Sequence, residues 1–382
     1  MNRLSRMRGA ALKLGQMLSL EGEDFLPPEV AKILQRLRSD ADVMPEDQVR
    51  KVMKKRYGKK WETLFQEFDY MPFASASLGQ VHRAKAKDGR DLALKIQYPG
   101  VRKSIDSDVD NLATMLSVFK ILPAAADFSE LIAGVKRQLH QEADYLREMR
   151  EANLFREKLA DYTEFVIPEV FEDLTTPTIL AMEYVEGEPI EHLADDVFVQ
   201  KDRDRVGEQL LELLLLEIFS FHRIQTDPNF ANYLYQADTH RLVLLDFGAS
   251  RKVRKRFATG YRLLVDAVLE DDPMELEKAL DELGVMGSAM IEEDRDLMVQ
   301  FVMMAAEPLR CEGPYDFQNS TLTERIRAEG FKVKPSQKLR FPVPPPEFLF
   351  YQRKLAGMFL LCKRIHAKVD CQQLLREQLP AA

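Results

Sequence analysis

Three short polar clusters at fixed spacing constrain this chain more than any other feature. Asp227 stands five residues before Asn232, and Asp246, in the tripeptide Asp246-Phe247-Gly248, follows Asp227 by nineteen residues. Between the last two clusters, residues 242–245 are uniformly apolar and predict a short buried strand. Such a strand would bring an amide and two carboxylates together, and oxygen atoms of these groups are the ligands that Mg²⁺ prefers.

Protein-kinase-like folds hold Mg²⁺ and the phosphates of ATP with an Asp, an Asn and a second Asp at this spacing. The Asp-Phe-Gly tripeptide alone would be weak evidence, because tripeptides recur by chance, but the spacing of all three groups is specific. In such a fold a strand-borne lysine holds the α- and β-phosphates, and Lys95 lies late in the apolar run 92–96. The alternative is a solvated lysine on an edge strand, which the presence of Asp227 and Asp246 makes the weaker interpretation.

The lysine needs an acidic partner on a following helix, and the run from Glu142 to Glu148 offers candidates. If residues 128–159 form one helix, Glu142 and Glu148 lie about 240° apart at ~100° per residue and cannot serve the same partner. Asp144 and Glu148 would then share a face. A charged, solvated helix face is the alternative interpretation of the run.

The segment expected to cover the phosphates departs from the usual glycine-rich pattern. Residues 73–82 read Phe-Ala-Ser-Ala-Ser-Leu-Gly-Gln-Val-His, and we call them the alanine-rich loop. Because only glycine enters positive φ cheaply, we expect a stiffer loop that cradles the nucleotide differently. No GxxxxGK[ST] sequence exists, which excludes a P-loop NTPase. The predicted nucleotide-binding residues are Ala74, Ser75, Ala76, Ser77, Gly79, Gln80 and Lys95, with Glu183 and Val185.

The predicted catalytic loop departs as well. Gln225-Thr226-Asp227 stands where a kinase would carry His-Arg-Asp. After Gly248 a short basic stretch, residues 251–256, leads into a helix expected by about Ala258. This leaves no room for a long activation segment, and no Ala-Pro-Glu follows. The usual platform for docking a protein substrate is therefore expected to be missing.

Composition narrows the class of protein. The 382 residues suffice for two or more cores, and the net charge of −8 argues against wholesale binding to nucleic acid. The three cysteines have no CxxC spacing and are expected to be reduced thiols, and the six histidines have no metal-ligand spacing. No uninterrupted apolar run reaches the ~18 to 20 residues of a spanning helix. We see no secretory signal.

The periodicity predicts three regions. Residues 1–68 should form a helical extension, 69–186 a small sheet-bearing lobe with inserted long helices, and 187–382 a mostly helical lobe, with a hinge at 185–187. The expected helices are several within 2–66, one beginning at Pro45, then 104–122, 128–159 and a last one at 347–366 after the proline-rich linker 335–346. The expected strands are 77–86 and 91–97, joined by an Asp-Gly turn at 88–89, then 165–172 and 177–184.

Together these motifs resemble those of the UbiB family of atypical kinases, in its coenzyme Q biosynthesis subgroup. Several independent motifs in order, over nearly the whole chain, make the resemblance specific. Ser75 departs from the alanine more common in the family, and no C-terminal membrane span of the kind found in some bacterial members is apparent. The matching elements are Lys13-Leu14-Gly15-Gln16, the alanine-rich loop, Lys95, Glu142-x-Asp144 with Glu148, residues 225–229 with Asn232, Asp246-Phe247-Gly248 and residues 343–347.

The resemblance implies an α+β, protein-kinase-like bilobal fold whose N-terminal helical extension packs over the active site. Lys13 would reach toward the phosphates, held by Glu142 and Asp144, and Glu148 would pair with Lys95. ATP or ADP and Mg²⁺ are the implied ligands. Asn232 and Asp246 would ligate the metal, and Asp227 would orient the attacking water or hydroxyl.

The implied activity is ATP hydrolysis in support of ubiquinone biosynthesis. Implied partners are ubiquinone-pathway lipids or enzymes and an anionic membrane surface, which the basic N-terminal helices would approach. The sequence does not decide whether the chain forms a homodimer. The expected location is peripheral, at the bacterial inner membrane or the matrix face of the mitochondrial inner membrane. The alternatives are a small-molecule or lipid kinase and a non-enzymatic scaffold that binds nucleotide.

Overall fold

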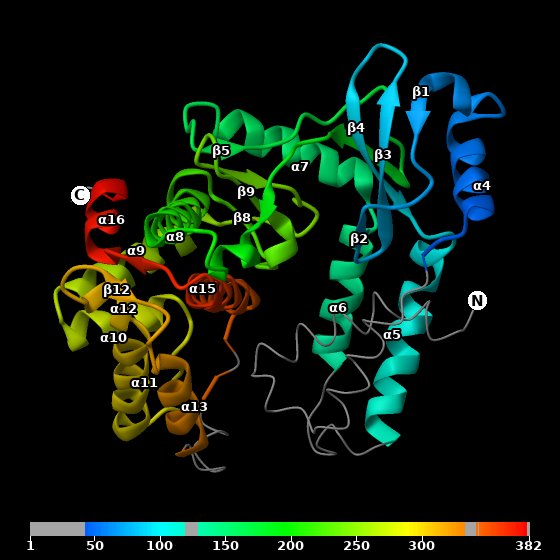
Figure 1. The fold of residues 1–382 in the computed structure, drawn as a ribbon. Helices are drawn as coiled ribbons and strands as arrows, with labels where there is room; N and C mark the ends of the chain where they lie inside the picture. Colours follow the sequence, from blue (N-terminus) through cyan, green and yellow to red (C-terminus); the bar gives the residue numbers. More distant parts are fainter. Residues whose placement is uncertain (1–42, 119–128, 333–340, 343, 380–382) are drawn as a thin grey trace. The chain divides into compact units, whose positions relative to one another are not determined.

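Figure 1 shows the computed structural model, which describes residues 43–118, 129–332, 341–342 and 344–379. The chain divides into two compact units. Among the described residues, the first comprises 43–118, 129–161, 167–186 and 245–249, and the second comprises 162–166, 187–244, 250–332, 341–342 and 344–379. A division therefore falls between Glu186 and Gly187, within residues 185–187, where the sequence predicted a hinge.

The first unit is built on an antiparallel sheet of five strands (Figure 1). Its order is β1-β3-β4-β6, and β2 pairs with β3. The turn between β3 and β4 contains Gly89 at a φ of +94°, a conformation that glycine adopts without steric cost. The strands are β1 (Phe65–Phe68), β2 (Ala74–Ala76), β3 (Gly79–Ala86), β4 (Asp91–Gln97) and β6 (Ile179–Glu183).

One face of this sheet is covered by α4, which lies beside β1 in Figure 1. Val49 and Met53 of α4 join Trp61, Leu92 and Ile96 in one buried cluster. Pro45 precedes the helix as its N-cap residue, which confirms the predicted start. The helices of this unit are α4 (Glu46–Tyr57), the 3₁₀ turn η2 (Trp61–Leu64), α5 (Val101–Val118), α6 (Ser129–Glu142) and α7 (Tyr145–Lys158).

Three sequence-based expectations about secondary structure were wrong. Of the strand expected over 165–172, only Phe165–Val166 forms a strand, and Val170 makes an isolated bridge to Met182. The helix expected over 128–159 is two helices, because Asp144 interrupts it. The Asp144 carboxylate accepts a hydrogen bond from the Arg147 backbone N–H at 3.2 Å and so caps the N-terminus of α7. Residues 65–66, expected to close a helical region, instead begin β1.

The second unit contains a four-stranded sheet in the order β5-β10-β9-β7, with β5 and β10 parallel. The predicted buried strand before Asp246 is confirmed as β10, in which Leu242, Val243 and Leu244 are buried. The sheet strands are β5 (Phe165–Val166), β7 (Glu188–Pro189), β9 (Tyr233–Gln236) and β10 (Arg241–Leu244). Two further pairs are β8 (Arg223–Gln225) with β11 (Ser250–Lys252), and β12 (Tyr315–Asp316) with β13 (Lys368–Val369).

Helices make up most of the second unit. The long helix α8 (Gln200–Leu215) continues into a π-helical turn, η4 (Leu216–Ser220), and two 3₁₀ turns are η3 (Ile190–Ala194) and η5 (Phe230–Asn232). The remaining helices are α9 (Lys255–Leu269), α10 (Pro273–Glu282), α11 (Glu292–Ala305), α12 (Glu307–Arg310), α13 (Leu322–Lys332), α15 (Pro346–Arg364) and α16 (Cys371–Gln378). The helix expected after the proline-rich linker is confirmed as α15, but β13 and α16 follow it.

None of the helices within the described ranges combines the length and the apolar character that crossing a bilayer requires.

Candidate functional site

Lys95 is the centre of a charge cluster in the first unit. It comes from β4, and its partners come from two distant segments. Its Nζ lies 2.8 Å from Glu148 Oε1, in the first turn of α7, and 3.0 Å from Asp246 Oδ2, in the segment 245–249. One lysine therefore joins a strand, a helix and the Asp-Phe-Gly segment.

Burial makes this cluster electrostatically strong. The side chains of Lys95, Glu148 and Asp246 are 12%, 2% and 27% exposed. Burial alone would lower the pKa of Lys95, but the carboxylates of Asp246 and Glu148 outweigh it and raise that pKa well above its usual value. Burial raises the pKa of Glu148 to about 7, against the opposing charge of Lys95. The ammonium is thus held charged between two acids in a medium where water screens little.

Two residues of α7 fix the Asp-Phe-Gly segment. Arg147 donates a hydrogen bond from Nη1 to the carbonyl of Gly248, and Phe155 packs against Phe247 with ring centroids 4.8 Å apart. The buried Tyr145 presents its ring to Lys95 Nζ at 5.4 Å. Sequence reasoning missed these three α7 residues, because a charged helix gives its arginines and aromatics no distinguishing spacing.

The alanine-rich loop forms a tight hairpin. Ala74, Ser75 and Ala76 of β2 pair with β3, and Ala76 faces Gly79. A side chain at Gly79 would overlap the Ile96 carbonyl group, so close packing against β4 requires glycine there. The backbone carbonyl of Leu78, at the hairpin tip, accepts from the Tyr98 N–H at 3.0 Å.

The other predicted residues of this loop have different neighbours. Ser77 donates from Oγ to Glu142 Oε2 at 3.4 Å, which connects the loop with the last residue of α6. Gln80 is buried, accepts from the backbone N–H of Met44 at 2.8 Å and contacts a ring nitrogen of His82 at 2.8 Å. Its side chain therefore holds the strand in place from within the core.

The two predicted residues at the end of the sheet are less buried. Glu183 ends β6, is exposed, and accepts from the Glu169 N–H at 3.2 Å. Val185 is half-buried and precedes the division between the units. Lys13 lies outside the described residues.

In the second unit, residues 226–229 form the Asp227 loop, between β8 and η5. Its backbone is fixed by two side chains: Gln225 Oε1 accepts from the Asp227 N–H at 2.8 Å, and Asn232 Nδ2 donates to the Asp227 carbonyl at 2.9 Å. The Asp227 carboxylate is 16% exposed, and its Oδ1 lies 3.4 Å from Arg353 Nη2, from α15. Sequence reasoning missed Arg353, because 126 residues separate it from Asp227.

The oxygen donors of each unit fit a hard cation. A Cβ added at Gly248 would lie 3.3 Å from both Asp246 Oδ1 and Glu148 Oε2, so both acid oxygens border the small space that the glycine leaves. Glu148 Oε2 is buried and has no hydrogen-bond partner within the described ranges. Asn232 uses its amide nitrogen toward Asp227, which leaves the amide oxygen as the atom for a ligand. Carboxylate and amide oxygens suit Mg²⁺.

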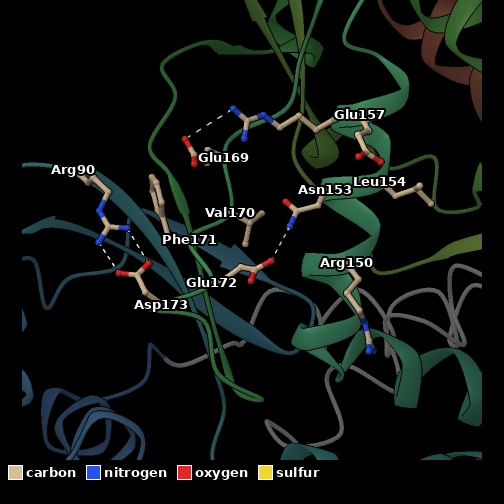
Figure 2. A pocket seen from close by; sticks show the side chains of 11 residues that line it. Arg90, Arg150, Asn153, Leu154, Glu157, Glu169, Val170, Phe171, Glu172 and Asp173 are labelled. Atoms are coloured by element: carbon tan, nitrogen blue, oxygen red, sulfur yellow. Dashed lines mark hydrogen bonds and ion pairs between the residues drawn. The ribbon is translucent and has the colours of Figure 1, made fainter.

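A hollow of about 840 Å³ lies elsewhere in the first unit, beside α7 (Figure 2). Its charged groups largely pair with one another. Arg90 binds both oxygens of Asp173, at 2.9 and 2.7 Å, and Arg156 lies 3.9 Å from Glu169. None of the residues predicted to bind nucleotide or metal lines it.

Comparison with known proteins defines the class. Residues 36–280 match the model of the ABC1 atypical kinase-like domain. A solved complex of Rv3197 with erythromycin from Mycobacterium tuberculosis superposes with a TM-score of 0.72 at 23% identity, covering 96% of this chain and 90% of that one. The predicted α+β, protein-kinase-like fold is confirmed.

Two curated relatives match almost the whole chain. It is 40% identical over 379 residues to the mitochondrial atypical kinase coq-8 of Caenorhabditis elegans, covering 98% of this chain and 49% of that protein. It is 39% identical over 380 residues to the mitochondrial atypical kinase COQ8 of Saccharomyces cerevisiae, covering 98% and 74%. The chain belongs to the ABC1, or UbiB, family of atypical kinases, as its motifs predicted. It spans about half the length of the nematode relative.

Proposed function

We propose that the chain binds ATP with Mg²⁺ and hydrolyses ATP in support of coenzyme Q biosynthesis. One observation carries the proposal: Lys95 forms ion pairs with both Glu148 and Asp246. Kinase-like enzymes need a lysine for the phosphates, a helix acid to hold it and an Asp-Phe-Gly aspartate for the metal. Burying this charge cluster is expensive unless the groups serve a ligand or one another.

The proposed roles follow from the chemistry of each group. Lys95 holds the α- and β-phosphates, and Glu148 holds Lys95. Asp246 and Asn232 bind Mg²⁺, which when bound neutralises charge on the phosphates. Asp227 orients the attacking water.

The residues around these groups complete the proposal. The hairpin of the alanine-rich loop, from Ala74 to Gln80, covers the nucleotide, with Glu183 and Val185 toward the base. Lys13, with Glu142 and Asp144, lies near the phosphates. The contact between Ser77 and Glu142 supports a link between the loop and that acidic pair.

We propose water, and not a protein hydroxyl, as the acceptor of the γ-phosphate. β11 begins at Ser250, two residues after Gly248, and α9 begins at Lys255, so no long activation segment intervenes. In protein kinases that segment helps to dock the substrate protein. A small-molecule or lipid kinase is the second candidate, since a lipid hydroxyl would need no such platform.

The proposed role in coenzyme Q biosynthesis rests on sequence similarity to known proteins. Relatives covering nearly all of the chain are mitochondrial atypical kinases named for COQ8. We propose that ubiquinone-pathway lipids or enzymes are the partners, at an anionic membrane surface, with peripheral attachment at the matrix face or the bacterial inner membrane.

Phosphate release tests the proposal. Wild-type chain with Mg-ATP, with and without anionic liposomes carrying a ubiquinone-like lipid, should release inorganic phosphate. Asp246→Asn keeps the shape and removes the metal-binding charge, so it should abolish release and the ATP-induced rise in Tm. The exposed Asp161→Asn is the matched control and should behave as wild type. Equal release from Asp246→Asn refutes the metal role, and phosphate found on the lipid favours the second candidate.

A further inference from the structure

Helix α15 is anchored in the second unit by contacts that do not involve the Asp227 loop. Near its start, Glu347 accepts from Arg254 Nε at 2.8 Å. The Arg251 guanidinium lies 3.9 Å from the centroid of the Phe350 ring, and Tyr351 stacks on Phe257 at 4.4 Å. The helix is therefore a fixed support.

Arg353 extends from this support to Asp227. Its side chain is 8% exposed, and its Nη2 lies 3.4 Å from Asp227 Oδ1. A carboxylate held at one oxygen by a cation has a restricted rotation about its Cβ–Cγ bond.

The next residue, Lys354, supports the Asp227 loop indirectly, through Glu217 and Gln225. Lys354 is fully buried, 3.3 Å from Glu217 Oε2 in the π-helical turn and 3.4 Å from the Tyr233 hydroxyl. Glu217 Oε1 accepts from the Gln225 N–H at 3.3 Å, and Gln225 in turn accepts from the Asp227 N–H. Adjacent residues of α15 thus reach the aspartate directly and through its backbone.

The third contact is steric. One turn beyond Arg353, Gly357 faces the ring of Pro228, and a methyl group there would overlap that ring. Pro228 directly follows Asp227, so the distance between the Asp227 loop and α15 depends on the absence of a side chain at Gly357.

We infer that Arg353 is a positioning residue for the Asp227 carboxylate, and that α15 sets the geometry of the Asp227 loop through Arg353, Lys354 and Gly357. This inference rests on the nucleophile-orienting role proposed for Asp227. The family motif supplies no arginine in Gln225-Thr226-Asp227, and the cation beside the aspartate comes instead from a helix 126 residues later.

Arg353→Met, which keeps the apolar stem and removes the charge, is the first test. Because a small misplacement of a reacting group can cost up to about 10²-fold, kcat should fall by about 10- to 10²-fold. The KM for ATP and the ATP-induced rise in Tm should stay at wild-type values. Arg353→Lys should recover part of kcat, since it restores charge without the planar fork. The exposed Arg364→Met, on the same helix, is the control.

A double-mutant cycle with Asp227→Asn separates positioning from general stability. If Arg353 acts through Asp227, Arg353→Met should lower kcat no further in the Asp227→Asn background. If the fold-losses in kcat of the two single variants multiply in the double variant, the inference is overturned. Wild-type turnover in Asp227→Asn alone would instead overturn the proposed function, whereas loss in Asp227→Asn with wild-type turnover in Arg353→Met overturns only the inference.

Gly357→Ala gives a second measurement that leaves every charge in place. It should lower kcat by about tenfold through Pro228, again within the range for a displaced reacting group. Ala356→Ser, one residue away and exposed, should leave kcat unchanged. Unchanged turnover in both Gly357→Ala and Arg353→Met, with both proteins folded by Tm, would reject α15 as the support of the loop.

Discussion

Single residues in this chain carry charges into places where water cannot screen them. Lys354 and Glu217 are 0% and 1% exposed and face each other across 3.3 Å. Burial would lower the pKa of Lys354, but the Glu217 carboxylate raises it, and burial raises the pKa of Glu217 to about 7. Each group therefore depends on the other for its charge.

Lys354→Met should consequently be far more destabilising than its shape suggests. Removing one partner leaves a buried, uncompensated carboxylate, at a cost of about 3–5 kcal/mol in the free energy of unfolding. Adding Glu217→Gln should recover much of that loss. Urea unfolding of the single and double variants measures both, with the exposed Lys278→Met as the control. A double variant less stable than Lys354→Met would exclude the buried charge as the cause.

Replacing glycine by alanine should change stability in opposite directions at two positions, Gly79 and Gly330. A methyl at Gly79 would meet the Ile96 backbone, which cannot move aside, so Gly79→Ala should cost about 1–3 kcal/mol of stability. Gly330 lies within α13 with open space around it, so Gly330→Ala should stabilise by up to about 1 kcal/mol. Thermal unfolding compares the two. Equal Tm changes would mean that the hairpin can relax away from β4.

At the scale of elements, α8 presents a pH-dependent surface. Burial, followed by the charges of Glu164, Glu208 and Glu377, raises the pKa of Glu212 from its ordinary 4.5 to about 7. A carboxyl whose folded pKa is raised contributes stability below pH 4.5 and loses that contribution as pH rises through about 7.

Glu212→Gln removes this titration. Wild type should lose stability relative to the variant as pH rises from about 4.5 to 7, so the Tm difference should be larger at pH 8 than at pH 5. The exposed Glu282→Gln serves as the control. A Tm difference that is the same at both pH values would show that Glu212 titrates as an ordinary carboxyl.

Elements also show which features a sequence can disclose. β4 was predictable because Gly89 marks its turn and because Leu92, Leu94 and Ile96 recur at every second position. The break between α6 and α7 was not predictable. The apolar period continues through Ala143, and the chain leaves the helix only because the single residue Asp144 caps the start of α7. The geometric argument that put Asp144 and Glu148 on one helical face was therefore wrong, although Glu148 does pair with Lys95.

Across the whole molecule, spacing in the sequence identified candidate site residues more readily than the residues that support them. Lys95, Asp227, Asn232 and Asp246 were recognisable because each lies in a short motif. Arg353 has no motif of its own, and its relation to Asp227 exists only after α15 has folded onto the second unit. Long-range contacts of that kind leave no periodic trace in a single sequence.

The five residues 245–249 belong to the first unit although β10 and β11, on either side of them, belong to the second. Likewise residues 162–166, which supply β5, interrupt the first unit. Neither unit is therefore a continuous piece of chain, and no single cut releases one intact. On a ribosome, Lys95 emerges 151 residues ahead of Asp246, so a nascent chain that ends at the Asp227 loop holds its lysine with only one of the two acids. The charge cluster becomes complete only when synthesis has passed well into the second unit.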